Sequence, residues 1–192
     1  MRGDVIPQTA ALRILLAAVA GNEATGGLIE VRYRRRERSG MGQLFHPAER
    51  PDAIIETVQR LGARTDVYVG AAPRRRRQGG ADAIERVWSL WADLDGQEAV
   101  DALGAFTPAP SIIIRTGSGP NCHAWWPMRE PLTPELAQRA CRRLAHRLGG
   151  DMASTDPARI LWPLSVGARY GRGDVPAWSF EDASSSGRGD RR

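Results

Sequence analysis

Three short apolar runs in the middle of the sequence constrain the fold most. They read DVYVGA at 66–71, VWSLWADL at 87–94 and SIIIR at 111–115. β-Branched and aromatic residues at this density favour strands. The last run is apolar at nearly every position, as expected for a strand that is covered on both faces. Because helices must supply that cover, the sequence predicts an α/β (α+β) fold with a mixed sheet and flanking helices.

Helical patterns alternate with these strands. Apolar residues recur at helical spacing between 9 and 20, which predicts a first helix. Pro51 opens a second helix that ends at Gly62, and Thr133 caps the longest one, which ends at Gly149. The remaining expected elements are a helix at 97–106, a turn at 39–42 and strands at 28–36, 122–127 and 159–162.

The chain length suits one domain with a tail. The 192 residues divide into an N-terminal helical segment at 1–25, a compact domain at 26–164 and a tail at 165–192. Gly, Ser, Arg and Asp dominate the tail, so it is expected to be disordered.

The first helix could be mistaken for a secretion signal. It ends in Ala18-Val19-Ala20, but Asp4 precedes it and Arg13 interrupts its apolar stretch. We therefore expect a mature helix in a cytoplasmic protein without membrane contact.

Arginine supplies all of the positive side-chain charge apart from any on histidine. The chain has 27 basic and 22 acidic residues, a net charge of +5 and no lysine, which favours a polyanionic partner. Two arginine groups are candidates for contact with a nucleic-acid backbone, the alternative being solvated surface. They are Arg74, Arg75, Arg76 and Arg77 in a loop, and Arg139, Arg142, Arg143 and Arg147 along one helix face.

Two carboxylates end the strand at 87–94. Alternate side chains of a strand share a face, so Asp93 and Asp95 project together. Two such carboxylates repel each other unless a cation lies between them. Hard oxygen ligands suit Mg²⁺ or Mn²⁺. The alternative is an ordinary strand end that reaches solvent.

A glycine-rich segment, TGSGPNCH at 116–123, follows the next strand. Backbone amides of such a turn, including that of Gly119, can hold phosphate oxygens. Ser118 adds a hydroxyl donor, His123 an imidazole donor and the adjacent Arg115 a positive charge. The segment is not a Walker A loop, because it has no lysine and no following helix. The alternative is a tight turn with a buried histidine.

A third polar segment, DMASTDPARILW at 151–162, offers one more acid and a cation. Either Asp151 or Asp156 can serve as a third carboxylate, and Arg159 can bind phosphate. The alternative for each acid is an ordinary turn opener. The two cysteines, Cys122 and Cys141, match no zinc spacing, and Cys141 is expected to be buried on a helix face.

The order of these segments resembles the archaeo-eukaryotic-type primase superfamily, and within it the RepB-like primase–polymerase domains of plasmids, phages and integrated elements. The motifs that carry the resemblance are VYVGAAPR, WADLD, TGSGPNCHAWWP, LGGD and DPARIL, between about 26 and 161.

The resemblance implies a fold, a reaction and a role for each motif. The fold is a primase–polymerase core with an RRM-like sheet. The reaction is metal-dependent synthesis or extension of primers on single-stranded DNA from NTPs or dNTPs, with two Mg²⁺ or Mn²⁺ ions and a separate helicase as a further partner. Asp93, Asp95 and Asp156 match metal ligands, with Asp151 as the alternative to Asp156. Ser118 and His123 match the triphosphate-binding motif, and Arg159 matches a basic residue of the third motif.

The sequence departs from the family after DPARIL. The family continues as Arg-hydrophobic-Pro-Gly-Thr and a later Asn, whereas this chain reads LWPLSVG at 161–167. This departure motivates the first of two alternatives to the primase prediction, and the shared acids motivate the second. One is a degenerate, non-catalytic nucleic-acid-binding protein. The other is a metal-dependent nuclease or phosphatase that uses the same acids.

Overall fold

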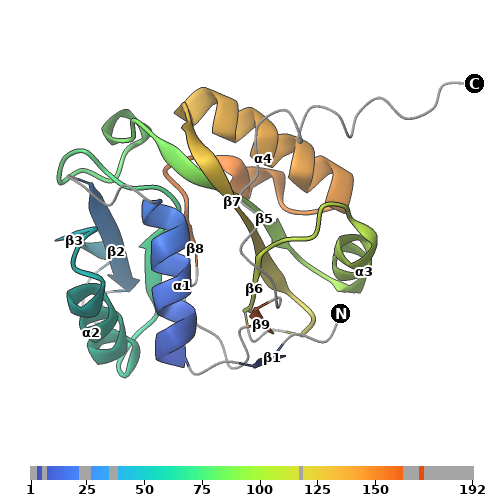
Figure 1. Ribbon diagram of the computed structural model, residues 1–192. Coiled ribbons are helices and arrows are strands. Elements are labelled where there is room, and N and C mark those ends of the chain that lie inside the picture. The colour runs from blue at the N-terminus through green and yellow to red at the C-terminus, as the bar shows by residue number, and fades with distance from the viewer. Residues whose placement is uncertain are drawn as a thin grey trace, which may run out of the picture.

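The computed structural model describes residues 4–5, 8–21, 27–34, 39–116, 119–161 and 169–170. Two antiparallel sheets lie side by side, with helices around them (Figure 1). The five-stranded sheet has the order β1 (Asp4–Val5), β9 (Arg169–Tyr170), β6 (Ile112–Arg115), β7 (Cys122–Leu132) and β5 (Val87–Leu94). The four-stranded sheet has the order β3 (Met41–Pro47), β2 (Leu28–Arg34), β4 (Val67–Gly70) and β8 (Ile160–Leu161).

Four α-helices flank the described strands, which confirms the α/β (α+β) class. Figure 1 shows α2 (Pro51–Gly62) beside the four-stranded sheet, and α3 (Gln97–Ala105) and α4 (Pro134–Leu148) beside the five-stranded one. Helix α1 (Gln8–Ala20) lies between the two sheets, where it packs against α2, β5 and β7. Every described strand pair is antiparallel, whereas the sequence predicts a mixed sheet. The reason is that β7 lies between β5 and β6, so the α3 connection creates no parallel neighbours.

Most elements begin and end close to their predicted positions. The sequence prediction misses β3, because a turn was expected at 39–42 and the strand begins at Met41. The prediction of a disordered tail is wrong for Arg169–Tyr170, which form β9 against β6. The other residues of the predicted tail lie outside the described residues.

One hydrophobic core joins both sheets and α1. Leu12 and Val19 of α1 are fully buried in the same cluster as Trp91 and Trp125. The rings of Trp91 and Trp125 are 5.9 Å apart at a tilt of 43°. The N-terminal helix therefore belongs to the core of the domain and does not form a separate unit. No helix among the described residues is both long and apolar enough to cross a membrane.

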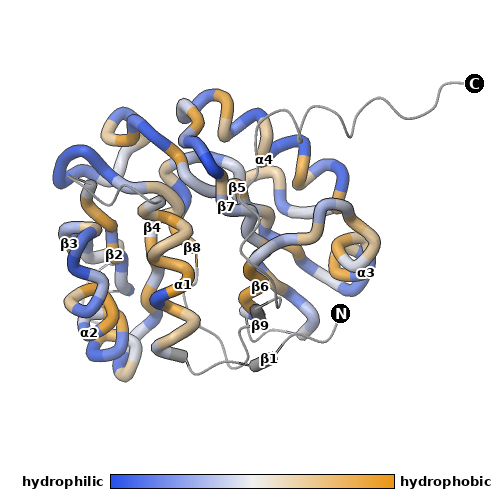
Figure 2. Tube along the Cα trace, in the orientation of Figure 1, coloured by the Kyte–Doolittle hydropathy of each residue, from blue (hydrophilic) through white to orange (hydrophobic). Residues whose placement is uncertain are grey.

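Helix α4 leads the chain back to the end of β5. Its N-terminus is capped by the Thr133 hydroxyl, which accepts a hydrogen bond from the Leu136 amide at 3.4 Å. Its C-terminus is capped by Gly149 at φ +70°. Hydrophilic and hydrophobic residues alternate along the helix (Figure 2). Cys141 lies on the buried side as predicted, and burial raises the pKa of its thiol to about 12.

A close backbone approach then fixes the segment after α4. The Asp151 amide donates to the Asp93 carbonyl at 2.8 Å. A Cβ on Gly150 would lie 2.6 Å from that carbonyl oxygen, so only glycine permits this approach. The segment at 151–161 is therefore held against the acidic end of β5.

Candidate active site

Asp93 and His123 are cross-strand neighbours at one end of the five-stranded sheet. The row across β6, β7 and β5 is Ile114, His123 and Asp93. His123 Nε2 lies 3.3 Å from Asp93 Oδ1. His123 is only 3% exposed, and its buried Nδ1 has no hydrogen-bond partner among the described residues. The imidazole thus faces the carboxylate with one nitrogen and keeps the other unused.

Ser154 connects Asp93 to a second carboxylate. Its buried hydroxyl oxygen lies 2.9 Å from Asp93 Oδ2 and 2.6 Å from Asp151 Oδ2. The carbonyl of Ser154 accepts a hydrogen bond from Trp91 Nε1 at 2.7 Å, which fixes the residue against β5. Two carboxylates from distant parts of the chain therefore meet at one hydroxyl group.

The single hydroxyl hydrogen of Ser154 cannot serve both carboxylates. A serine hydroxyl carries a single hydrogen, so it can donate to one of the two carboxylates only. The other carboxylate then faces an oxygen without a proton between them, which is unfavourable unless a proton or a cation is present. The geometry at Ser154 therefore favours a positively charged occupant beside Asp93 and Asp151.

The electrostatic setting keeps Asp93 ionised. Burial by itself raises the pKa of this carboxyl, but several partners outweigh that effect and leave the pKa below its usual value. The strongest of them is the hydrogen bond from His123, followed by the charge of His123, the Ser154 hydroxyl and the charge of Arg159. An ionised, partly buried carboxylate is an effective ligand for a cation.

The glycine-rich segment lies at the same end of the sheet as the acids. Asp95 follows β5 directly and is exposed. The next amide, that of Gly96, donates to the side-chain oxygen of Asn121 at 2.8 Å. Arg115 is exposed at the end of β6, and Gly119 has φ +60° in the loop between β6 and β7. Ser118 lies outside the described residues.

The structure separates the two candidates for a third acid. The Asp151 carboxylate lies at Ser154, as described, and 3.8 Å from Arg159 Nη2. Asp156 is exposed, and its Oδ1 accepts a hydrogen bond from the Ala158 amide at 2.7 Å. Asp151, named in the sequence analysis as the alternative, is thus the acid that meets Asp93, whereas Asp156 stabilises a turn.

The arginines predicted to bind DNA fall into different environments. Arg74 is fully buried and forms an ion pair with Glu30, so the prediction that Arg74 contacts DNA is wrong for this structure. Arg76 is exposed and pairs with Asp82, and Arg75 and Arg77 are exposed in the same loop. The exposed residues on α4 include Arg139 and Arg143.

The residues at the end of β5 fit a divalent metal ion. Within the described ranges, no three His, Cys, Asp or Glu side chains gather as a ready metal site. Mg²⁺, however, is commonly held by one or two carboxylates, with water and substrate phosphates as its other ligands. Asp93 and Asp151, which meet at Ser154, could supply these carboxylates.

Two residues of the site had no signal in the sequence analysis. Ser154 is an unremarkable serine within DMAST, and Asn121 lies inside the glycine-rich segment without a marked role. Only the fold brings Ser154 to Asp93, 61 positions earlier, and Asn121 to Gly96, 25 positions earlier. A search for hydroxyl and amide residues in the three polar segments would have included both.

Comparison with known proteins finds similar solved structures but no similar sequence. No protein-family model and no curated protein sequence matches the chain. Among solved structures, the AEP domain of the primase-polymerase (PrimPol) from cyanophage S-2L superimposes with a TM-score of 0.69 and 16% identity. That match covers 92% of this chain and 96% of the other. The chain has the fold of an archaeo-eukaryotic primase–polymerase domain.

Two further solved structures have the same primase–polymerase fold. The catalytic domain of primase RepB′, solved with initiator DNA, matches with a TM-score of 0.62 and 17% identity, over 93% of this chain and 94% of that one. A longer structure of primase RepB′ matches with a TM-score of 0.61 and 16% identity, over 92% of this chain and 62% of that one. These matches confirm at the level of fold the RepB-like resemblance seen in the sequence.

Proposed function

We propose that this chain is a metal-dependent nucleotidyltransferase that starts or extends primers on single-stranded DNA. The observation that carries the proposal is the meeting of Asp93 and Asp151 at one hydroxyl beside His123, at the acidic end of β5. The primase–polymerase fold supports the class of reaction.

Asp93, Asp95 and Asp151 are the proposed metal ligands, with Asp156 as the weaker candidate because its oxygen already serves a turn. A bound pair of Mg²⁺ or Mn²⁺ ions would supply charge neutralisation for the attacking hydroxyl and for the leaving pyrophosphate. Ser154 keeps the carboxylates of Asp93 and Asp151 together, and His123 keeps that of Asp93 ionised.

The loop between β6 and β7 is the proposed site for the nucleotide phosphates. Its amides, the Ser118 hydroxyl, the charge of Arg115 and the imidazole of His123 would hold them in place. Arg159, next to Asp151, would add a further charge. Positioning and charge stabilisation of this kind contribute most of the catalysis in phosphoryl transfer.

Exposed arginines are the proposed contacts to the template. Arg75, Arg76 and Arg77 lie in the loop between β4 and β5, and Arg139 and Arg143 on α4. Lone phosphate contacts of this type give salt-dependent, sequence-independent binding. RepB′ with its initiator DNA supports the choice of DNA as partner. A helicase on a separate chain is a further proposed partner, and this proposal rests on the sequence resemblance alone.

The test is primer synthesis and extension on single-stranded DNA with labelled NTPs and dNTPs, in Mn²⁺ or in EDTA. Asp93→Asn is compared with Asp52→Asn, an exposed carboxylate on α2 that pairs with Arg13. We expect metal-dependent products from wild type and Asp52→Asn and none from a folded Asp93→Asn. Products that do not require Asp93 would overturn the assignment.

A second candidate is a non-catalytic DNA-binding protein. It is favoured by the burial of His123 and by the engagement of both Asp93 oxygens with groups of the same chain. This candidate predicts salt-sensitive DNA binding by folded wild type without any incorporation. Cleavage of the template DNA into short fragments in Mn²⁺ would instead favour a nuclease.

A further inference from the structure

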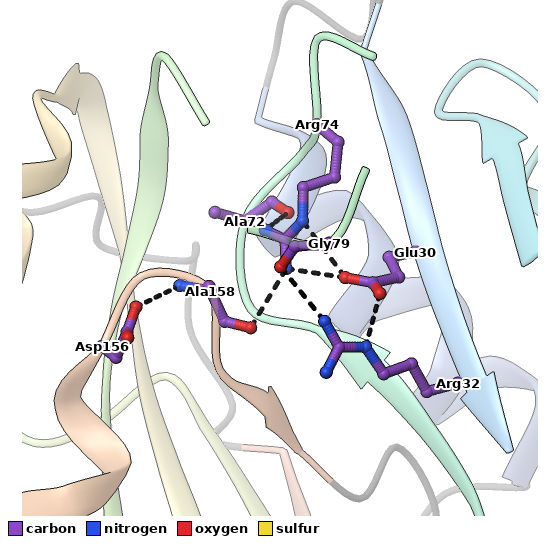
Figure 3. A network of polar contacts seen from close by, with 7 residues as sticks. All are labelled: Glu30, Arg32, Ala72, Arg74, Gly79, Asp156 and Ala158. Atoms are coloured by element: carbon purple, nitrogen blue, oxygen red, sulfur yellow. Dashed lines mark hydrogen bonds and ion pairs between the residues drawn. The ribbon is translucent and has the colours of Figure 1, made fainter. Parts of the chain in front are cut away.

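A fully buried ion pair lies between the four-stranded sheet and the loop that follows β4. Arg74 and Glu30 are both 0% exposed. Glu30 Oε2 accepts hydrogen bonds from Arg74 Nη2 at 2.8 Å and from Arg74 Nε at 3.2 Å (Figure 3). Both donors reach the same carboxylate oxygen, and together they restrict the orientation of the guanidinium group.

The remaining donors of Arg74 reach two backbone carbonyls. Nη1 donates to Ala72 at 2.9 Å, and Nη2 donates to Ala158 at 3.2 Å. The second contact leaves the four-stranded sheet and holds the segment that follows α4. Figure 3 shows Arg74 between Glu30 on one side and Ala158 on the other.

Neighbouring hydrogen bonds make the same segment rigid. The Ala158 and Arg159 amides donate to Asp156, to its side chain and its carbonyl respectively. The Arg159 carbonyl accepts from the Ala71 amide at 2.9 Å. At its other end the segment is held by the bond from the Asp151 amide to Asp93. Residues 151–159 are thus fastened at one end to β5 and at the other to Arg74 and Ala71.

Stability alone does not explain a buried ion pair. Replacement of such a pair by apolar side chains of similar volume is often neutral or stabilising. Apolar side chains, however, cannot hold the Ala158 carbonyl. The ion pair therefore fixes the position of the polar segment that carries Asp151 and Arg159.

We propose that Arg74, oriented by Glu30, is a positioning residue that holds residues 151–159 so that Asp151 and Arg159 face Asp93. The inference rests on the proposed function, because it assigns Asp151 to the metal site. Arg74 acts through Ala158 and contacts neither the proposed nucleotide site nor the template.

The test compares wild type with the double variant Glu30→Met/Arg74→Met. Both charges of the Glu30–Arg74 pair are removed together. Arg32, whose Nε also pairs with Glu30 at 2.5 Å, is 22% exposed and keeps the Gly79 carbonyl as an acceptor. Thermal unfolding verifies that the variant folds. The more conservative Arg74→Lys keeps the charge for Glu30 but lacks the planar fork, and it serves as the second variant if the double variant does not fold. Arg34→Met, which removes an exposed ion pair with Asp66 from β2, is the matched control.

Two measurements are made on each protein. The first is hydrogen–deuterium exchange, for which we expect faster exchange of the amides at 151–159 in the double variant and unchanged exchange in β5 and β7. The second is the Mn²⁺ concentration that gives half-maximal incorporation, which we expect to rise by about 10–100-fold, as for loss of outer partners of a metal site. If only part of the variant protein were folded, the maximal incorporation would fall, but the Mn²⁺ concentration for half-maximal incorporation would not change.

Each outcome decides one question. Faster exchange at 151–159 with a raised Mn²⁺ requirement supports the proposal. Unchanged exchange in a folded double variant overturns it, and so does faster exchange with an unchanged Mn²⁺ requirement. If wild type incorporates no nucleotide, the proposed function fails, while the exchange data still decide whether Arg74 holds the segment.

Discussion

Ser154→Ala tests whether one hydroxyl group holds the two carboxylates together. The substitution removes the contacts of 2.9 Å to Asp93 and 2.6 Å to Asp151, but it keeps the backbone carbonyl that binds Trp91. A hydrogen bond to a charged group contributes about 1.5–3 kcal/mol. We therefore expect the free energy of unfolding at neutral pH in EDTA to fall by about that amount less the cost of the contact with the second carboxylate, to which the hydroxyl cannot also donate. For a domain of this size Tm would fall by up to about 12 °C.

Ser89→Ala is the matched control within the same chain. The Ser89 hydroxyl is also buried, and it donates to the Ala18 carbonyl at 2.7 Å, a neutral acceptor. A neutral hydrogen bond contributes about 0.5–1.5 kcal/mol. Urea unfolding of both variants measures the difference. Equal losses, or a Ser154→Ala variant as stable as wild type, would refute the charge-assisted contact.

The effect of Ser154→Ala has a defined pH dependence. The pKa of Asp93 is lowered in the folded protein, so its contribution to stability is present above its unfolded pKa of about 3.9 and is lost as the pH falls through the lower folded value. The stability difference between wild type and Ser154→Ala is therefore expected to shrink at pH 3 relative to pH 7. An unchanged difference would contradict the assignment to Asp93.

Four further predictions concern the acidic site, the glycine that precedes Asp151 and the proposed template contacts. Asp151→Asn is expected to reduce incorporation much more than Asp156→Asn, and the reverse order would return Asp156 to the metal site. Gly150→Ala is expected to destabilise the protein by about 1–3 kcal/mol through the clash with Asp93, whereas Gly104→Ala, with open space around it in α3, is expected to stabilise by about 0.5–1 kcal/mol. His123→Gln is expected to raise the pKa of Asp93, measured by carboxyl NMR titration. Arg139→Gln/Arg143→Gln is expected to lower the salt dependence of DNA binding by about two phosphate contacts, and an unchanged slope would place the template elsewhere.

Local sequence patterns were sufficient for the elements with clear boundary signals. Helix α2 begins at Pro51, and α4 lies between the Thr133 cap and Gly149, because proline, threonine and glycine act on their own neighbours. Strand β5 was also predicted from its local sequence, because most of its residues are apolar and rich in tryptophan. In contrast, β3 contains glycine and ends in proline, and it is a strand because it pairs with β2.

The limits of prediction at the site have one physical cause, which is separation along the chain. The acids and the glycine-rich segment were recognised, because each is a local motif. The choice between Asp151 and Asp156 depends on Ser154 and on the return of α4 to β5, which no local pattern contains. Arg74 was grouped with three arginines beside it, although its partner Glu30 lies 44 positions earlier.

The path of the chain between the two sheets has a consequence for folding. After β2, β3 and β4 the chain builds β5, β6 and β7 in the other sheet, returns with β8 beside β4, and leaves again with β9 beside β6. Each sheet is interrupted along the chain by strands of the other, and one hydrophobic core joins the two, so a large opening of one sheet is expected to disturb the other. The domain is therefore expected to unfold as one cooperative unit, and the acids at the end of β5 to stay together until that transition.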